Sequence, residues 1–237
     1  MIYAREQPLF EDRPDGGRKL AEKLAEYKNQ PVLVLAIPNG GVLVGLEVTK
    51  ALEADFNVII SRKIPMPLNP EAGIGAVTDD GTVILNPELV KRLKLNQNQI
   101  NYQVNQVRAQ LYQRSILYRK DRPLYGVSGK TVIIVDDGLA SGYTMLAAIE
   151  SVRHRHPREL IAAVPVASGT ALKEVEKVVD RVVVCTTSFK PGFFVADFYR
   201  YWYDLSDQET LKYLTRWWTR HLRPDIGQST SPSPGNG

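Results

Sequence analysis

The chain has 237 residues, of which 43% are hydrophobic and 24% charged, as is ordinary for a globular α/β protein long enough to bury a full core. Its formal net charge of +4 suits phosphate-bearing small ligands and is too small to require a nucleic acid partner. The lone Cys185 excludes an internal disulfide framework, and the absence of a signal pattern or a membrane-length apolar run predicts a cytoplasmic protein with no membrane partner.

Strands and helices alternate along the chain, which predicts a single α/β domain over residues 1–226 with a mostly parallel twisted sheet flanked by helices. The expected strands are residues 32–37, 58–61, 82–85, 132–135, 160–166 and 181–185. The expected helices are residues 15–27, 41–52, 88–119 with a break near Leu95, 145–152, 170–178 and 207–222. Residues 85–125 are expected to form a helical excursion, 186–222 a small hood with a closing helix, and 227–237 a disordered tail.

A glycine pair follows the first strand, in the sequence Pro38-Asn39-Gly40-Gly41, and a helix comes next. Glycines let backbone N–H groups approach an anion closely, at a helix start whose dipole favours negative charge. Because Asn-Gly is also a common turn dipeptide, this loop alone is a weak signal.

Two cations, Arg62 and Lys63, follow the second expected strand. Ligands of open α/β sheets lie beyond the carboxyl ends of the strands, so both side chains are expected to face the same crevice as the glycine pair. The alternative is a pair of solvated charges at a strand end. The Pro/Gly-rich residues 64–77 are expected to be irregular and to form a flexible lid, with Glu71 as either a substrate contact or a surface residue.

Three other features allow a structural interpretation. A narrow apolar stripe on the Gln/Asn-rich helix predicts packing on the domain or on a dimer partner, and its residues are Ile100, Val104, Val107, Leu111 and Tyr118. The basic run 153–158 is best explained as cations at a helix C-terminus. The aromatic residues of 189–203 would suit either stacking on a planar base or a core at the sheet edge.

The most informative stretch is residues 132–144, with the sequence VIIVDDGLASGYT. Its first four residues predict a buried parallel strand, after which stand Asp136 and Asp137. The carboxylates can accept hydrogen bonds from vicinal ribose hydroxyls or hold a divalent cation. The small-residue loop and the next helix offer a phosphate their backbone N–H groups and the hydroxyls of Ser141 and Thr144. The stretch therefore predicts a site for a phosphorylated sugar, the alternative being a strand-end turn with Ser141 as helix cap.

This stretch resembles the phosphoribosyl diphosphate (PRPP) motif of type I phosphoribosyltransferases, and with the Arg62-Lys63 string and the aromatic C-terminal segment the resemblance extends to about Leu214. It implies the type I phosphoribosyltransferase fold. By resemblance, Asp136 and Asp137 contact the ribose hydroxyls and, through them, Mg²⁺. The implied 5-phosphate loop consists of Gly138, Leu139, Ala140, Ser141, Gly142, Tyr143 and Thr144.

The resemblance also makes Asn39, Gly40 and Gly41 the pyrophosphate loop, which in this family often contains a cis peptide bond. Related sequences commonly carry a basic residue where this chain has Asn39. The lid over residues 64–77 would exclude water from the activated ribose.

The implied activity is Mg²⁺-dependent transfer of a phosphoribosyl group from PRPP to a nitrogen nucleophile, expected to be a nucleobase, with release of pyrophosphate by a homodimer. Arg62 and Lys63 would join Asp136 and Asp137 as catalytic residues by stabilising the leaving pyrophosphate. Asn39 keeps open a second hypothesis, a PRPP-sensing regulator without turnover. A Mg²⁺-dependent hydrolase is a weaker third, because its two acidic residues are typically spaced Asp-x-Asp.

Overall fold

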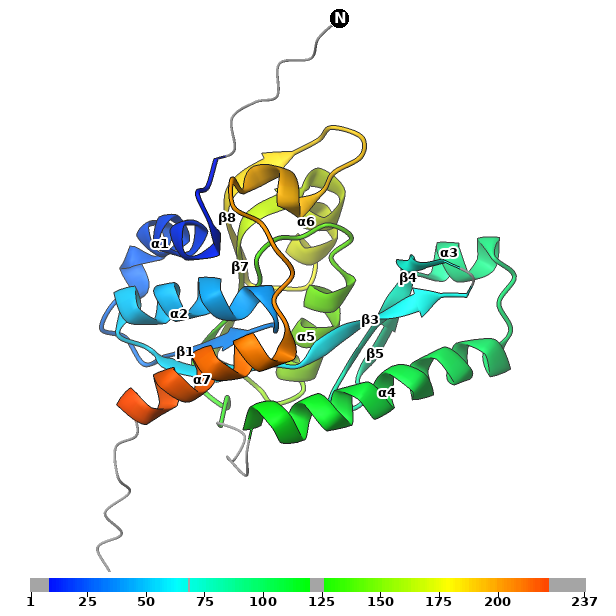
Figure 1. Cartoon of the computed structure of the whole chain (residues 1–237), viewed down its shortest axis with the longest axis horizontal. Coiled ribbons are helices and arrows are strands. Elements are labelled where there is room, and N and C mark those ends of the chain that lie inside the picture. Colours follow the sequence, from blue (N-terminus) through cyan, green and yellow to red (C-terminus); the bar gives the residue numbers. More distant parts are fainter. Residues whose placement is uncertain (1–8, 68, 120–125, 222–237) are drawn as a thin grey trace, which may run out of the picture.

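A five-stranded sheet forms the centre of the computed structural model, which describes residues 9–67, 69–119 and 126–221, with the side chains of residues 70 and 71 left out (Figure 1). The strand order is β2-β1-β6-β7-β8, and every neighbouring pair is parallel. The strands are β1 Val32–Ala36, β2 Asp55–Val58, β6 Thr131–Val135, β7 Glu159–Ser168 and β8 Arg181–Ser188. This topology confirms the predicted parallel α/β sheet.

Helices cover both faces of this sheet (Figure 1). One face carries α1 Arg13–Lys23, α2 Gly40–Leu52 and α7 Asp207–His221. The other carries α5 Tyr143–Arg153 and α6 Gly169–Glu176. Successive strand residues point to opposite faces, so Val34 packs under the first group of helices and Leu35 under the second. A strand buried on both faces needs apolar residues throughout, which explains the unbroken run of β6.

A second, antiparallel sheet projects from the main one (Figure 1) and contains β3 Ser61–Met66, β4 Asn69–Thr78 and β5 Val83–Leu85. The expected strand over 58–61 is therefore wrong, because β2 ends at Val58 and β3 starts at Ser61. The expectation of irregular structure over 64–77 is also wrong. The ladder of this hairpin shifts register on both sides of Pro65, and such irregularities are where sheets accommodate proline.

The expected helix over 88–119 is present, with a break. It consists of α3 Pro87–Arg92 and α4 Gln97–Arg119, with the break close to Leu95. The apolar stripe of α4 is buried against the main core, which supports packing on the domain, and Tyr118 is fully buried. The basic run follows α5 as expected, with the Arg153 side chain donating to the carbonyl of Val178.

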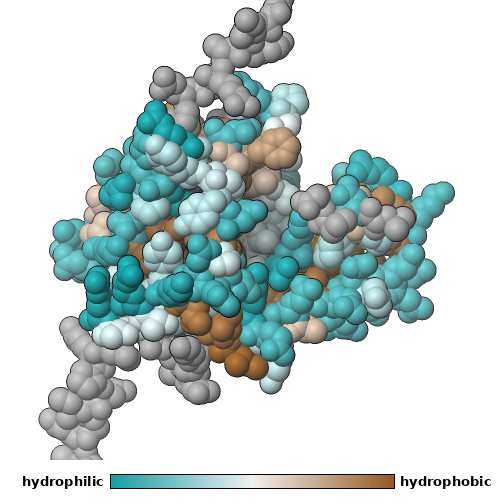
Figure 2. Space-filling view, in the orientation of Figure 1, coloured by the Kyte–Doolittle hydropathy of each residue, from teal (hydrophilic) through white to brown (hydrophobic). Residues whose placement is uncertain are grey.

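The first described residues lie beside residues 198–200. Phe10 donates to the Phe198 carbonyl over 3.0 Å and accepts from the Arg200 amide over 2.8 Å. Two short 3₁₀ helices are η1 Ala25–Tyr27 and η2 Val195–Phe198. The face seen in Figure 2 is largely hydrophilic, with apolar residues in small patches, and none of the described helices is both long and apolar enough to cross a bilayer. The tail predicted over 227–237 lies outside the described residues.

Candidate functional site

The acidic pair and the glycine loop meet where β1 and β6 end. A Cβ atom added to Gly40 would lie 1.8 Å from Asp137 Oδ2, and one added to Gly41 would lie 2.8 Å from the Val135 carbonyl oxygen. Only glycine permits this approach at the start of α2. The Pro38–Asn39 peptide bond is cis, as the family resemblance implied. Two segments almost a hundred residues apart in the sequence thus form one site.

A cation that the sequence did not reveal holds one of the carboxylates. Arg13 Nε lies 2.7 Å from Asp137 Oδ2, and Arg13 Nη1 donates to the Tyr203 carbonyl over 2.8 Å. The guanidinium lies 3.7 Å from the ring centroid of Trp202, which suits a cation–π contact. The Arg13 side chain is only 5% exposed. This clamp fixes the position of Asp137, and the positive charge of Arg13 partly neutralises the negative charge of the acidic pair.

The environment of Asp136 disfavours its charged form. Burial, followed by the nearby charge of Asp137, raises the pKa of Asp136 well above its ordinary value. Burial also raises the pKa of Asp137, while Arg13 opposes the rise. The Asp137 amide donates to Asp136 Oδ1 over 2.8 Å. Two buried carboxylates with one cation leave negative charge that hydroxyl donors or a divalent ion would stabilise.

The loop after the acidic pair is anchored by the end of β7. Leu139 donates to the Val166 carbonyl over 2.9 Å and accepts from the Ser168 amide over 2.8 Å. The Ser168 hydroxyl donates to the Ala140 carbonyl over 2.7 Å. Ser168 also caps α6, and nothing in its local sequence signals its contact with a loop 28 positions away. These bonds fix the loop without using the N–H groups of its second half.

The second half of this loop runs into the N-terminus of α5. The residue before the helix is Gly142, at φ 81°, and no side chain in the described part of the chain caps the helix. The alternative role of Ser141 as a cap is therefore wrong, and the Ser141 side chain is exposed. First-turn N–H groups have no acceptor within a helix, so they are available to an anion here. The backbone of Thr144 is anchored to β3, because its carbonyl accepts a hydrogen bond from the Ser61 hydroxyl over 2.9 Å.

Arg62 and Lys63 do not share a crevice as expected. They are consecutive residues of β3, so their side chains leave opposite faces of the strand. Burial and the charge of Arg114 lower the pKa of Arg62, which places Arg62 beside α4. The stem of Lys63 crosses Gly73, where an added Cβ would lie 2.4 Å from Lys63 Cγ. One strand therefore presents a positive charge on each of its faces.

Residues 195–199 pack against the acidic motif. A Cβ atom on Gly138 would lie 2.6 Å from a methyl group of Val195, and the Tyr199 hydroxyl donates to the Asp137 carbonyl over 2.7 Å. Tyr199 is buried between Phe10 and Trp202, with both ring-centroid distances at 5.2 Å. Cys185 packs against this cluster, and burial raises the pKa of its thiol to about 11.

The aromatic residues thus divide into two groups. The inner group is the core at the sheet edge, whereas Phe189 and Phe194 are 76% and 65% exposed. Both of the roles left open by the sequence therefore have residues that suit them.

Comparison with known proteins agrees with this geometry. A model of the phosphoribosyl transferase domain family matches residues 10–199. The chain belongs to this family. It is 34% identical over 208 residues to two Mycobacterium tuberculosis proteins, "Putative phosphoribosyl transferase MT0597" and "Putative phosphoribosyl transferase Rv0571c". The alignment covers 88% of this chain and 47% of each relative, so the chain spans about half the length of these proteins.

A solved structure is similar over nearly its whole length. The crystal structure of TT1426 from Thermus thermophilus is 33% identical and superposes with a TM-score of 0.72. The match covers 88% of this chain and 98% of TT1426. The family match covers residues 10–199, so it contains Arg13, the glycine loop and the acidic motif, but not Trp202 and Tyr203.

Proposed function

We propose that the protein is a PRPP-dependent phosphoribosyltransferase that transfers the sugar to a nitrogen nucleophile, a nucleobase in the first instance. The observation that carries the proposal is the meeting of an acidic pair, a glycine loop and an uncapped helix start at the carboxyl ends of β1 and β6. Such a crevice receives ligands in open α/β sheets. Family membership supports the same conclusion.

Each part of the site has a role in this reaction. Asp136 and Asp137 accept hydrogen bonds from the two ribose hydroxyls, with Arg13 holding Asp137 in place. The N–H groups at residues 141–144 bind the 5-phosphate. The glycine loop binds the pyrophosphate, with Arg62 on the side of β3 that faces α4 and Asp207. The protein thereby fixes the sugar at both ends and leaves its anomeric carbon between them.

The chemical step breaks the bond from the anomeric carbon to the pyrophosphate oxygen and forms a bond to nitrogen. Pyrophosphate departs with the bonding electrons, and the nucleophile loses a proton. The sugar passes through an oxocarbenium-like state, so catalysis consists mainly of positioning and of stabilising the departing negative charge. The glycine N–H groups and Arg62 perform the second task.

Mg²⁺ fits the residues present. The donor set consists of two carboxylates, and Mg²⁺ in proteins is commonly held by one or two carboxylates together with substrate phosphates. In the described residues no group of three or more potential ligands from His, Cys, Asp and Glu occurs, so substrate oxygens would complete the shell. Asp136 and Asp137 would face the ion through the ribose hydroxyls, and the ion would neutralise pyrophosphate charge.

The test is pyrophosphate release from PRPP with Mg²⁺ across a panel of purine and pyrimidine bases. We expect release with one class of base, and a loss of at least a hundredfold in Asp136→Asn and Asp137→Asn. Asp55→Asn is the matched control, because the Asp55 carboxylate is 61% exposed on β2. A chain that releases no pyrophosphate and does not bind PRPP in calorimetry refutes the proposal.

A PRPP-sensing regulator is the second candidate, and one observation favours it. The loop residue that is commonly basic in related sequences is Asn39, which brings no charge to the pyrophosphate. PRPP binding that depends on Asp136, without release for any base, would support the sensor over the enzyme.

A further inference from the structure

The side chain of Asn39 is committed to the protein framework. Its amide nitrogen donates to the Leu205 carbonyl over 2.7 Å and to Asp207 Oδ1 over 3.1 Å. Its amide oxygen accepts from the Tyr118 hydroxyl over 2.7 Å. Both ends of the amide are therefore used in holding the residue that precedes Gly40, and neither depends on a ligand.

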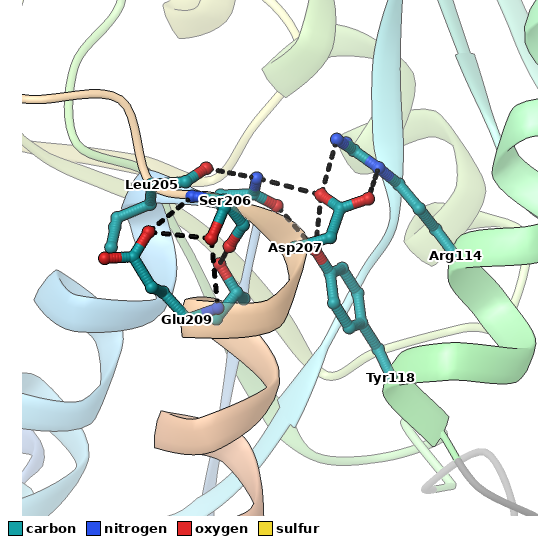
Figure 3. Close-up of polar contacts among 8 residues, drawn as sticks. Arg114, Tyr118, Leu205, Ser206, Asp207 and Glu209 are labelled. Carbon is teal, nitrogen blue, oxygen red and sulfur yellow. Dashed lines mark hydrogen bonds and ion pairs between the residues drawn. The ribbon is translucent and has the colours of Figure 1, made fainter.

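Asp207 is the hub of this arrangement (Figure 3). The Tyr118 hydroxyl lies 2.9 Å from Asp207 Oδ1 as well, and Arg114 contacts both carboxylate oxygens over 2.7 and 3.1 Å. Asp207 is the first residue of α7, while Arg114 and Tyr118 lie one turn apart on α4. Two helices from distant parts of the chain thus meet at the glycine loop.

The hub is charged, and its surroundings are positive. Burial acts to raise the pKa of Asp207, but hydrogen bonds from Asn39 and Tyr118 and the charge of Arg114 outweigh it and lower the pKa. The carboxylate is therefore ionised at neutral pH. Arg62 and Arg114 both lie close enough to influence one another, and Asp207 offsets only one of the two charges.

We propose that Asn39, Arg114, Tyr118 and Asp207 form a positioning junction that holds the N–H groups of Gly40 and Gly41 toward the pyrophosphate of PRPP. This proposal rests on the proposed function, and it adds residues of α4 and α7 to the site. At the position where related sequences commonly carry a basic residue, the junction fixes the loop through the Asn39 amide. These four residues act through the loop and need not touch the substrate.

Tyr118→Phe is the most direct test, because it removes the hydroxyl and keeps the buried ring. We expect the Kd of PRPP and the inhibition constant of pyrophosphate to rise together by about tenfold, while the KM of the acceptor stays unchanged. Asp207→Asn should raise the same two constants, and the double variant should lose less than the product of the single losses. Tyr102→Phe is the matched control, because Tyr102 lies on the same helix and is 63% exposed.

The outcomes separate the two proposals. If the wild-type chain neither binds PRPP nor releases pyrophosphate, the proposed function fails and the junction loses its substrate. If the wild-type chain binds PRPP and folded Tyr118→Phe binds it equally well, the junction alone is refuted. Equal losses for PRPP and acceptor would indicate a general packing defect and would also refute it. Should Tyr118→Phe not fold, Arg114→Gln decides by the same criteria, since the Arg114 side chain is 19% exposed.

Discussion

Arg13→Met isolates the energetic role of the clamp on Asp137. Methionine keeps an unbranched stem that can pack on Trp202, whereas the guanidinium and its hydrogen bonds are lost. Asp137, whose side chain is only 16% exposed, would then keep a negative charge beside Asp136 with no cation in contact. The structure therefore predicts a large loss of stability from a change outside the hydrophobic core.

The magnitude follows from the burial of the pair. Removing one partner of a buried ion pair costs about 3–5 kcal/mol, because the other charge stays desolvated and unpaired. The lower end applies here, since Asp137 retains some exposure and can take up a proton. We expect a loss of about 3 kcal/mol in the free energy of unfolding. For a chain of this length that corresponds to a fall in Tm of roughly 6–12 °C.

Urea denaturation of four proteins measures the effect: the wild-type chain, Arg13→Met, Asp137→Asn and the double variant. The double variant should recover most of the loss, because it no longer buries an unpaired charge. Arg18→Met is the matched control, since Arg18 lies on the same helix, is 56% exposed and contacts Asp15 over 3.5 Å. Equal losses for Arg13→Met and Arg18→Met would refute the clamp.

Three other changes have defined outcomes. Because the pKa of Asp136 is raised, the folded chain keeps a proton that the unfolded chain loses above about pH 4, so stability falls as pH rises toward the raised pKa. Asp136→Asn should reduce this fall in urea titrations and raise Tm at pH 7, while turnover drops at least a hundredfold. Ser168→Ala should cost about 1 kcal/mol in unfolding and raise the KM for PRPP, because the Ala140 carbonyl loses its donor. Gly40→Ala should abolish PRPP binding in calorimetry, since its Cβ would overlap the Asp137 carboxylate.

The sequence predicted those parts of the site whose signals are contiguous. The strand, the acidic pair, the loop and the helix start stand within residues 132–144, and the structure orders them as expected. The meeting of Gly40 with Asp137 was also predictable, because parallel strands deliver their carboxyl ends to one edge of the sheet.

What escaped prediction depends on contacts between distant residues. Arg13 reaches Asp137 across 124 positions, and Asn39 reaches Asp207 across 168. Arg13 and Asp207 each stand at an ordinary helix start, and no local sequence pattern signals their contacts. The β3–β4 hairpin escaped for another reason, since its prolines and glycines resemble a loop until the opposite strand supplies the hydrogen bonds.

The contact of Arg13 with the segment that ends at Tyr203 ties the completion of the site to the order of synthesis. Arg13 leaves a ribosome long before its acceptor at Tyr203, which follows 190 positions later. A nascent chain that has reached Ser188 contains every strand of the main sheet, but lacks the segment that encloses the guanidinium. Contacts between residues this far apart in the sequence form late in folding, because closing the intervening chain into a loop costs conformational entropy. The framework of the fold can therefore form before the centre that it serves, and a product truncated at this point would carry the acidic pair without its enclosed clamp.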